Sequence, residues 1–120
     1  MRNGRVESLD IFEIAAGWSG TQLVMHLSGE LDLCSASQVW QALDEAAVRT
    51  PTRVLLDLER LTFIDAVGIR AILRGAEIFG SRFILVRTPP RVMRVLTLAG
   101  VDERLTFGTD PPTDEPRAIP

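Results

Sequence analysis

Apolar residues change their spacing midway along this chain, and the change marks where a strand gives way to a helix. The run VLL at 54–56 is rich in strand formers and is typical of a central strand covered on both faces. From Ile69 onward, apolar residues recur at i, i+3, i+4 and i+7, which places them on one face of a helix. We therefore predict a strand at 53–58, a turn at 63–68 and an amphipathic helix closed by Gly80.

The other elements follow from the same patterns. Strands at 9–15 and 21–28, joined by a short loop with glycine and serine at 17–20, most simply form an antiparallel hairpin. After the hairpin, helical and strand patterns alternate. We predict helices at 35–49, capped by Ser35 or Ser37, and from 88 to 99, a strand at 82–86 and an edge strand at 105–107. The expected fold is α/β: a mixed sheet of four to five strands, with helices packed mainly on one face.

The 120 residues suit one folded domain, which we place at 9–107. Residues 1–8 are expected to be a disordered lead-in. The segment 108–120, GTDPPTDEPRAIP, contains four prolines and three acids, so we expect a disordered tail.

Composition narrows the possible functions. A net charge of -3 without a long basic run argues against a nucleic-acid surface. No signal-like or membrane-spanning apolar run is visible, so we expect a cytoplasmic protein without membrane insertion. All 13 basic residues are arginine. The lack of lysine excludes a P-loop, a Schiff-base enzyme and a receiver domain that uses lysine.

Few residues are candidates for chemistry. Cys34 is the single cysteine, which excludes an internal disulfide; we expect a small, partly buried residue, with a reactive thiol as the alternative. His26 alternates with apolar neighbours and is expected on the opposite strand face, at the surface or hydrogen-bonded. Trp40 lies in an apolar helical stripe and is expected in the core. Glu30 and Asp32 form an acidic pair that suits a solvated loop better than acid-base chemistry or a metal site. We predict no catalytic residue, metal or cofactor.

The turn at 63–68 is the most informative stretch. Asp65 can cap the following helix by accepting hydrogen bonds from its free N–H groups. Gly68 lets a ligand or a neighbouring backbone come close to the helix start. A phosphate at position 66 would be stabilised by the helix N-terminus, but this residue is alanine. An enzyme using Asp65 as nucleophile or base is the weaker interpretation, because no lysine, histidine cluster or glycine-rich phosphate loop supports it.

Two sequence motifs, together with the predicted order of strands and helices, resemble the STAS family, the sulfate-transporter and anti-sigma-factor-antagonist domain. LSGELD at 27–32 is similar to the loop after the family's second strand, and VLLDLERLTFIDAVGI at 54–69 is similar to its signature. The resemblance spans about Phe12 to Phe107 and includes the ending LTLAGVDERLTF. It implies a stand-alone bacterial anti-sigma factor antagonist, a binding protein that is not an enzyme. The alternative within the family is a subunit of a transporter ATPase complex or a stress-signalling scaffold.

The resemblance also implies a partner and a site. The partner would be an anti-sigma factor, often a histidine-kinase-like serine kinase that phosphorylates the serine after the motif aspartate. Here that position is Ala66, which has no oxygen to accept a phosphate. Thr62, Ser35 and Ser37 are the nearby alternative hydroxyls. The protein itself is expected to be a monomer or weak homodimer. The partner-binding residues implied are Glu30, Asp32, Asp65, Ala66, Val67, Gly68 and Arg70.

Overall fold

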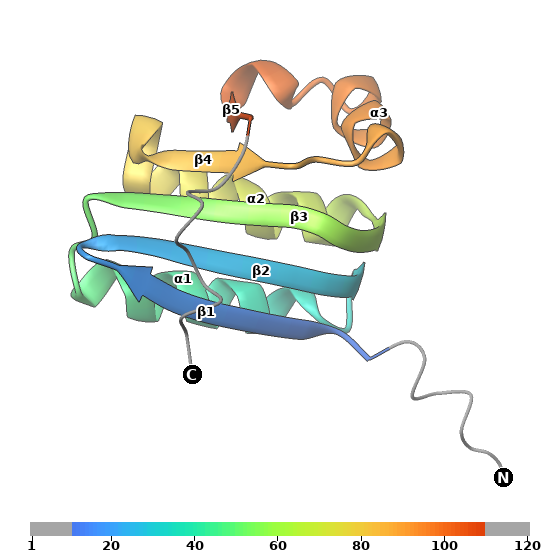
Figure 1. Cartoon of the computed structure of the whole chain (residues 1–120). Coiled ribbons are helices and arrows are strands. Elements are labelled where there is room, and N and C mark those ends of the chain that lie inside the picture. The colour runs from blue at the N-terminus through green and yellow to red at the C-terminus, as the bar shows by residue number, and fades with distance from the viewer. Residues whose placement is uncertain (1–10, 110–120) are drawn as a thin grey trace, which may run out of the picture.

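The computed structural model describes residues 11–109, which form one five-stranded sheet with three helices (Figure 1). The strands lie in the order β1-β2-β3-β4-β5. β1 is antiparallel to β2, and all other neighbours are parallel. The strands are β1 (Glu13–Ser19), β2 (Gln22–Leu31), β3 (Arg53–Ile64), β4 (Phe83–Val86) and β5 (Thr106–Gly108), and the helices are α1 (Ala36–Val48), α2 (Ala66–Phe79) and α3 (Pro90–Leu98).

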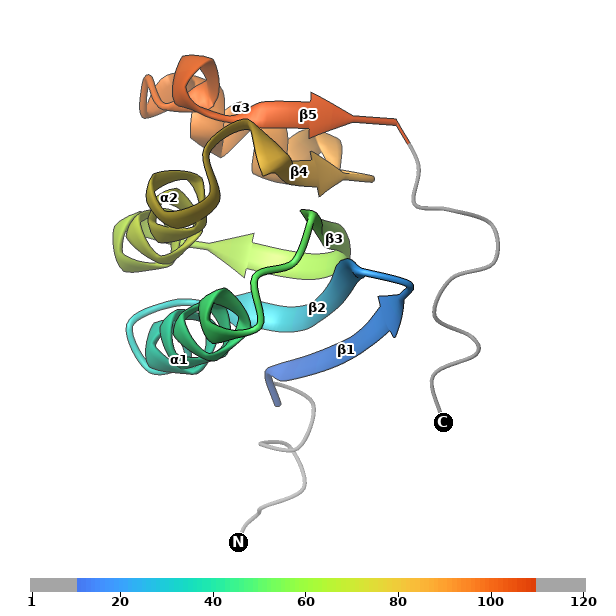
Figure 2. The same cartoon turned by 90° about the vertical axis from the view of Figure 1, so that its left-hand side faces the viewer.

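One face of the sheet carries the main core. α1 and α2 lie side by side against this face (Figure 2). Along β2 and β3, alternate residues such as Met25 and Leu56 point toward the helices and are buried. Leu43 of α1, Ile72 of α2 and Leu96 of α3 belong to the same apolar cluster. The predicted α/β fold, with an N-terminal hairpin and helices on one face, is confirmed.

The opposite face of the sheet carries a small second cluster of Val24, Leu55 and Val86. None of the helices between residues 11 and 109 packs on this cluster. Beyond this cluster, toward the carboxyl ends of the parallel strands, the same sheet face carries polar side chains, among them the buried Asp57. This face therefore combines a short apolar stripe with a buried charge.

The strands differ in length from the predictions. β1 continues through Gly17 and Trp18 to a two-residue turn at Gly20 and Thr21, where Gly20 has a positive φ of 66°. β2 and β3 both extend beyond the predicted ends, to Leu31 and Ile64, so the predicted turn at 63–68 is wrong. The charged residues 59 and 60 interrupt the apolar run of β3, and the pairing with β2 shifts register before Arg60 but continues to Ile64.

Three predictions about single side chains are also wrong. Trp40 lies at the exposed edge of α1 rather than in the core, and Cys34 is exposed rather than partly buried. Ser35 occupies the N-cap position of α1 but makes no capping hydrogen bond, and Ser37 lies inside the helix. The predicted lead-in and nearly all of the predicted tail lie outside the described residues, whereas Gly108 belongs to β5.

Two kinds of feature are absent from residues 11–109. No helix there is long and apolar enough to cross a membrane. Nor do the histidine, cysteine and acidic side chains at 11–109 form a group of three that could hold a metal ion.

Candidate functional site

The ends of β2 and β3 lie next to each other and lead into the site. In the parallel register, Glu30 pairs with Phe63 and Leu31 pairs with Ile64. Only Asp65 separates the end of β3 from the first residue of α2. The loop after β2 and the start of α2 therefore emerge at the same edge of the sheet.

Asp65 connects these two segments through hydrogen bonds. Its Oδ1 accepts the N–H of Gly68 at 2.9 Å, which caps α2 as predicted. Its Oδ2 accepts the N–H of Leu33 at 3.2 Å, in the loop after β2. The N–H of Asp65 donates to the carbonyl of Leu31 at 3.2 Å. One carboxylate thus holds the helix start and the neighbouring loop in a fixed relation.

Gly68 is required by the close approach of another backbone segment. A methyl group built on Gly68 would lie inside van der Waals contact with the carbonyl oxygen of Leu31. It would also come within 2.9 Å of the Leu31 side chain and 3.0 Å of the Ile64 side chain. The sequence predicted that Gly68 permits a close approach, and the neighbour here is the protein's own β2.

The loop after β2 is held by its own hydrogen bonds. Asp32 Oδ1 accepts the N–H groups of Cys34 at 2.9 Å and Ser35 at 3.2 Å. The buried Ser35 hydroxyl donates to the carbonyl of Glu30 at 2.6 Å. Asp32 and Ser35 therefore shape the loop, whereas the Glu30 side chain makes no hydrogen bond or ion pair with any of residues 11–109.

The two remaining alternative hydroxyls lie at the surface. Thr62 is exposed, and its hydroxyl donates to the carbonyl of Gly29 at 3.1 Å. Ser37 is exposed in the first turn of α1. Of the three hydroxyls named from the sequence, Ser35 is thus the one a kinase could not reach without opening the loop.

The protein surface around the start of α2, the loop after β2 and the end of β3 is partly apolar. Ala66 and Arg70 of α2 are exposed, and Val67 is half-buried. Leu33 is 72% exposed in the loop after β2, and Phe63 is 47% exposed at the end of β3. Exposed apolar residues gathered around one feature mark an interaction site more often than isolated ones do. We call this the α2 surface: Glu30, Leu33, Phe63, Ala66, Val67 and Arg70.

Sequence reasoning missed Leu33 and Phe63. Leu33 lies between two polar loop residues, and Phe63 directly precedes the buried Ile64, so neighbouring strand residues point to opposite faces. Recognising that the strand continues to Ile64 would have placed Phe63 on the uncovered side. Leu33 gave no comparable signal.

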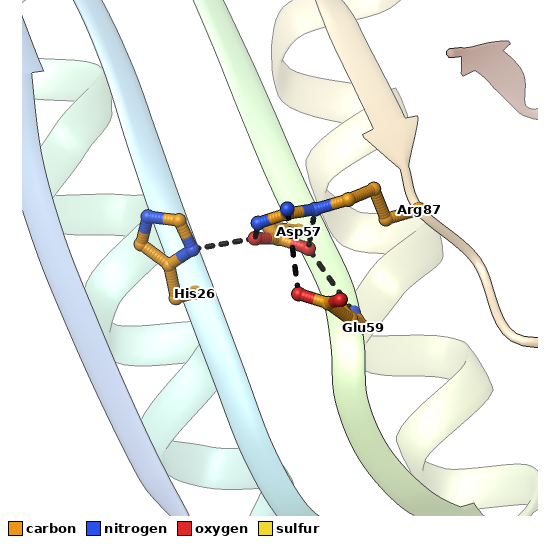
Figure 3. A network of polar contacts seen from close by, with 4 residues as sticks. All are labelled: His26, Asp57, Glu59 and Arg87. Carbon is orange, nitrogen blue, oxygen red and sulfur yellow. Dashed lines mark hydrogen bonds and ion pairs between the residues drawn. The ribbon is translucent and has the colours of Figure 1, made fainter. Parts of the chain in front are cut away.

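A separate polar network lies on the sheet face opposite the helices (Figure 3). The Asp57 carboxylate on β3 is 3% exposed and accepts from Arg87 Nη2 at 2.5 Å and His26 Nδ1 at 2.6 Å. The backbone N–H of Glu59 adds a bond at 3.1 Å. Burial alone raises the pKa of Asp57, but the bonds from Arg87, Glu59 and His26 outweigh it and hold that pKa below its usual value. The predicted position of His26, hydrogen-bonded on the face opposite the core, is confirmed.

This network supports the fold and includes none of the residues of the α2 surface. Arg87 follows β4 with a positive φ of 51°, a conformation that costs an ordinary residue on the order of 1–2 kcal/mol. Its ion pair with Asp57 helps hold that backbone in place. His26 and Asp57 resemble two members of a hydrolytic triad, but no serine or cysteine nucleophile is hydrogen-bonded to His26 in the described part of the chain.

Comparisons with known proteins agree with this architecture. A family model described as "Mlab, STAS domain" matches residues 14–107. The chain belongs to the STAS domain family. This match includes both strand ends and the helix start that build the α2 surface.

Curated relatives of this STAS domain include the anti-sigma-F factor antagonist RsfB of Mycobacterium tuberculosis, 28% identical over 82 residues that cover 67% of each chain. The anti-sigma F factor antagonist of Paenibacillus polymyxa is 31% identical over 83 residues, 66% of this chain and 71% of the relative. A crystal structure of an anti-sigma factor antagonist from Mycobacterium paratuberculosis superposes with a TM-score of 0.73 at 25% identity, covering 88% of this chain and 91% of that one.

Proposed function

We propose that this STAS domain is an anti-sigma factor antagonist that binds an anti-sigma factor through the α2 surface. Support comes from the relatives, which are named as antagonists of this kind. The observation that carries the proposal is the exposed Ala66 at a helix start that Asp65 ties to the loop after β2, with exposed Leu33 in that loop and exposed Phe63 at the end of β3. Such a surface suits protein binding better than catalysis.

Charge on the α2 surface adds to this proposal. Glu30 is available to an arginine of a partner, because its carboxylate has no hydrogen-bonding partner between residues 11 and 109. Asp32 and Asp65, which the sequence also assigned to partner binding, are used for the loop and the helix cap. In this proposal they act through the shape of the surface, and Glu30 and Arg70 make the direct polar contacts.

The second part of the proposal concerns regulation. The proposed partner is a histidine-kinase-like serine kinase. In this proposal, Ala66 takes the position of the serine that such a kinase phosphorylates in related antagonists. A phosphoryl group adds about -1.5 to -2 charges at neutral pH, but a methyl side chain cannot carry one. The antagonist would then stay bound under conditions that release a serine-containing relative. Phosphorylation of Thr62 or Ser37 is the remaining route to a switch.

A binding experiment tests the docking surface. Purified histidine-kinase-like anti-sigma factors from the source genome are titrated with the wild-type chain, Ala66→Glu and Ala66→Gln in a calorimeter. A glutamate at the first position of α2 is compatible with folding, because the helix dipole favours negative charge there. We expect wild type to bind, Ala66→Glu to lose at least about tenfold in affinity, and Ala66→Gln, the neutral control of similar size, to lose less.

The same proteins test regulation. Incubation with the binding kinase and labelled ATP should leave wild type unlabelled and should label Ala66→Ser. Failure of every anti-sigma factor to bind wild type would overturn the proposed function. A pull-down that instead captures a transporter ATPase subunit or a stress-signalling assembly would support the alternative roles within the family.

A further inference from the structure

A small groove lies beside the α2 surface, between the end of β3 and α3. Thr62, Phe63 and Ile64 form one wall, and Arg91, Val92 and Val95 form the other. Its volume is about 140 Å³. Cavities of roughly 150 Å³ accommodate a benzene-sized group, so the groove has room for one branched or aromatic side chain.

The walls of the groove are largely apolar and not fully covered. Val92 is buried and Val95 is half-buried, whereas Phe63 remains 47% exposed. Leu98, one turn beyond Val95 along the same face of α3, is 78% exposed. The groove therefore continues into an apolar stripe on a surface that the described part of the chain leaves open.

Two arginines border this stripe. Arg91 Nη1 donates to the carbonyl of Thr62 at 3.1 Å, which anchors the guanidinium at the mouth of the groove. Its other N–H groups remain for a ligand, since a guanidinium carries five donors. Arg94, one turn further along α3, is exposed. Neither Arg91 nor Arg94 forms an ion pair with residues 11–109, so both positive charges are available to a partner.

The groove shares Phe63 with the α2 surface, and its Arg91 carries a charge opposite to that of Glu30. Phe63 belongs to both, and it pairs in the sheet register with Glu30 on the far side. A partner segment that crosses Phe63 would meet a carboxylate at one end and Arg91 at the other. This asymmetry specifies the direction in which the segment lies.

We propose that the groove between β3 and α3 is a second contact for the partner, which takes one apolar side chain from an acidic segment and binds a carboxylate through Arg91. Complementary charge favours this occupant over a neutral or basic segment. The inference rests on the proposed function and adds a determinant of which anti-sigma factor is bound.

Charge reversal tests this contact. Arg91→Glu and Arg91→Lys are compared with wild type against the purified anti-sigma factors that wild type binds. Arg91 lies in the first turn of α3, which holds no acidic residue, so a glutamate there is compatible with folding. We expect a loss of about ten- to hundredfold for Arg91→Glu and a smaller loss for Arg91→Lys. The salt dependence of binding should weaken in Arg91→Glu and be retained in Arg91→Lys, which keeps the positive charge.

Arg53→Glu is the matched control, because Arg53 is an exposed arginine at the opposite end of β3. Its loss should stay below about threefold. A photo-crosslinking residue at the exposed Leu98 then identifies the occupant by mass spectrometry. A cross-linked partner peptide that contains acidic and apolar residues supports the proposal, whereas a cross-link to a second copy of this chain overturns it.

Failure of this inference can be distinguished from failure of the proposed function. If Ala66→Glu loses binding but Arg91→Glu binds like wild type, the α2 surface stands and the groove is not a contact. If both variants bind like wild type, the partner docks elsewhere and both proposals are overturned. If wild type binds no anti-sigma factor, the proposed function is overturned. The proposal for the groove is overturned as well, because it rests on that function.

Discussion

Replacing the buried carboxylate of Asp57 should destabilise the protein far more than replacing an exposed one. In Asp57→Asn, one oxygen of the carboxylate becomes an amide that donates hydrogen bonds. Arg87, His26 and the N–H of Glu59 all donate to this group, so the variant places a donor against donors. The buried charge that pairs with Arg87 is lost in the same step, which leaves Arg87 with its more exposed ion pair to Glu59 at 3.4 Å.

The size of the effect follows from the burial of each partner. Removing one member of a fully buried pair costs about 3–5 kcal/mol, and exposed pairs are worth about 0–1 kcal/mol. The Asp57 side chain is 3% exposed, but those of Arg87 and His26 are 35% and 25% exposed, so water can solvate them after the substitution. We therefore expect a loss of about 2–3 kcal/mol, or roughly 10–20 °C in melting temperature for a domain of this size.

Asp44→Asn provides the matched control. Asp44 forms an ion pair with Arg74 at 3.1 Å, with side chains 53% and 39% exposed, and the substitution removes the same charge. It should cost less than about 1 kcal/mol. Urea unfolding followed by circular dichroism at neutral pH measures both variants against wild type.

The pH dependence gives an independent check. The pKa of Asp57 in the folded protein lies below its ordinary value of 3.8, so the carboxylate stabilises the fold above that pH. This contribution is lost as the pH falls through the lowered pKa. The stability difference between wild type and Asp57→Asn should be constant near neutral pH and shrink below about pH 4. A cost no larger than that of Asp44→Asn, or a difference unchanged down to pH 3, would refute the argument.

Two further substitutions test how the α2 surface is built. Gly68→Ala forces a methyl group against the carbonyl of Leu31, and we expect a loss of about 1–3 kcal/mol in the free energy of urea unfolding. A stability equal to wild type would show that β2 and α2 can separate at no cost. Asp65→Ala removes the helix cap and the bond to Leu33, so unfolding should cost about 1 kcal/mol less. It should also speed amide hydrogen exchange at Leu33 and Gly68, and unchanged exchange at both would contradict the assigned role of Asp65.

Local patterns predicted the elements well, because each depends on residues close in sequence. The change from strand to helical spacing near Ile69 located α2, and Asp65 was recognised as its cap from position alone. Alternation placed His26 on the face away from the core. These features need only the periods of strand and helix and the chemistry of a helix end.

Contacts between distant residues could not be predicted in the same way. Asp57 meets His26 and Arg87, which lie 31 and 30 residues away. In the sequence it is only an acid within an apolar strand. The extension of β3 past Glu59 and Arg60 also depends on a neighbour, since pairing with β2 continues there despite the charges and two irregularities of register. Such features require the sheet register, which no local pattern contains.

The exposed positions of Leu33 and Trp40 show a related limit. An apolar residue in a helical stripe, such as Trp40, is predicted to be buried, because burial is the more common outcome, and the sequence contains no signal for Leu33. Trp40 is instead 36% exposed on α1. Leu33 is held out by a loop whose hydrogen bonds are formed by Asp32 and Ser35. The exposure of Leu33 therefore depends on the hydrogen bonds that fix the loop, and the apolar pattern of the sequence does not contain them.

The same supports bear on what Ala66 implies. The helix start is held by Asp65, the close contact of Gly68 with Leu31, and the loop bonds of Asp32 and Ser35. None of these involves the side chain of residue 66, which is exposed. A serine and an alanine at this position therefore leave the same surface, and they differ only in whether a phosphate can be attached. Under the proposed function, docking and switching would therefore depend on different atoms: alanine in place of a phosphoacceptor serine would remove the switch and leave the proposed docking surface unchanged.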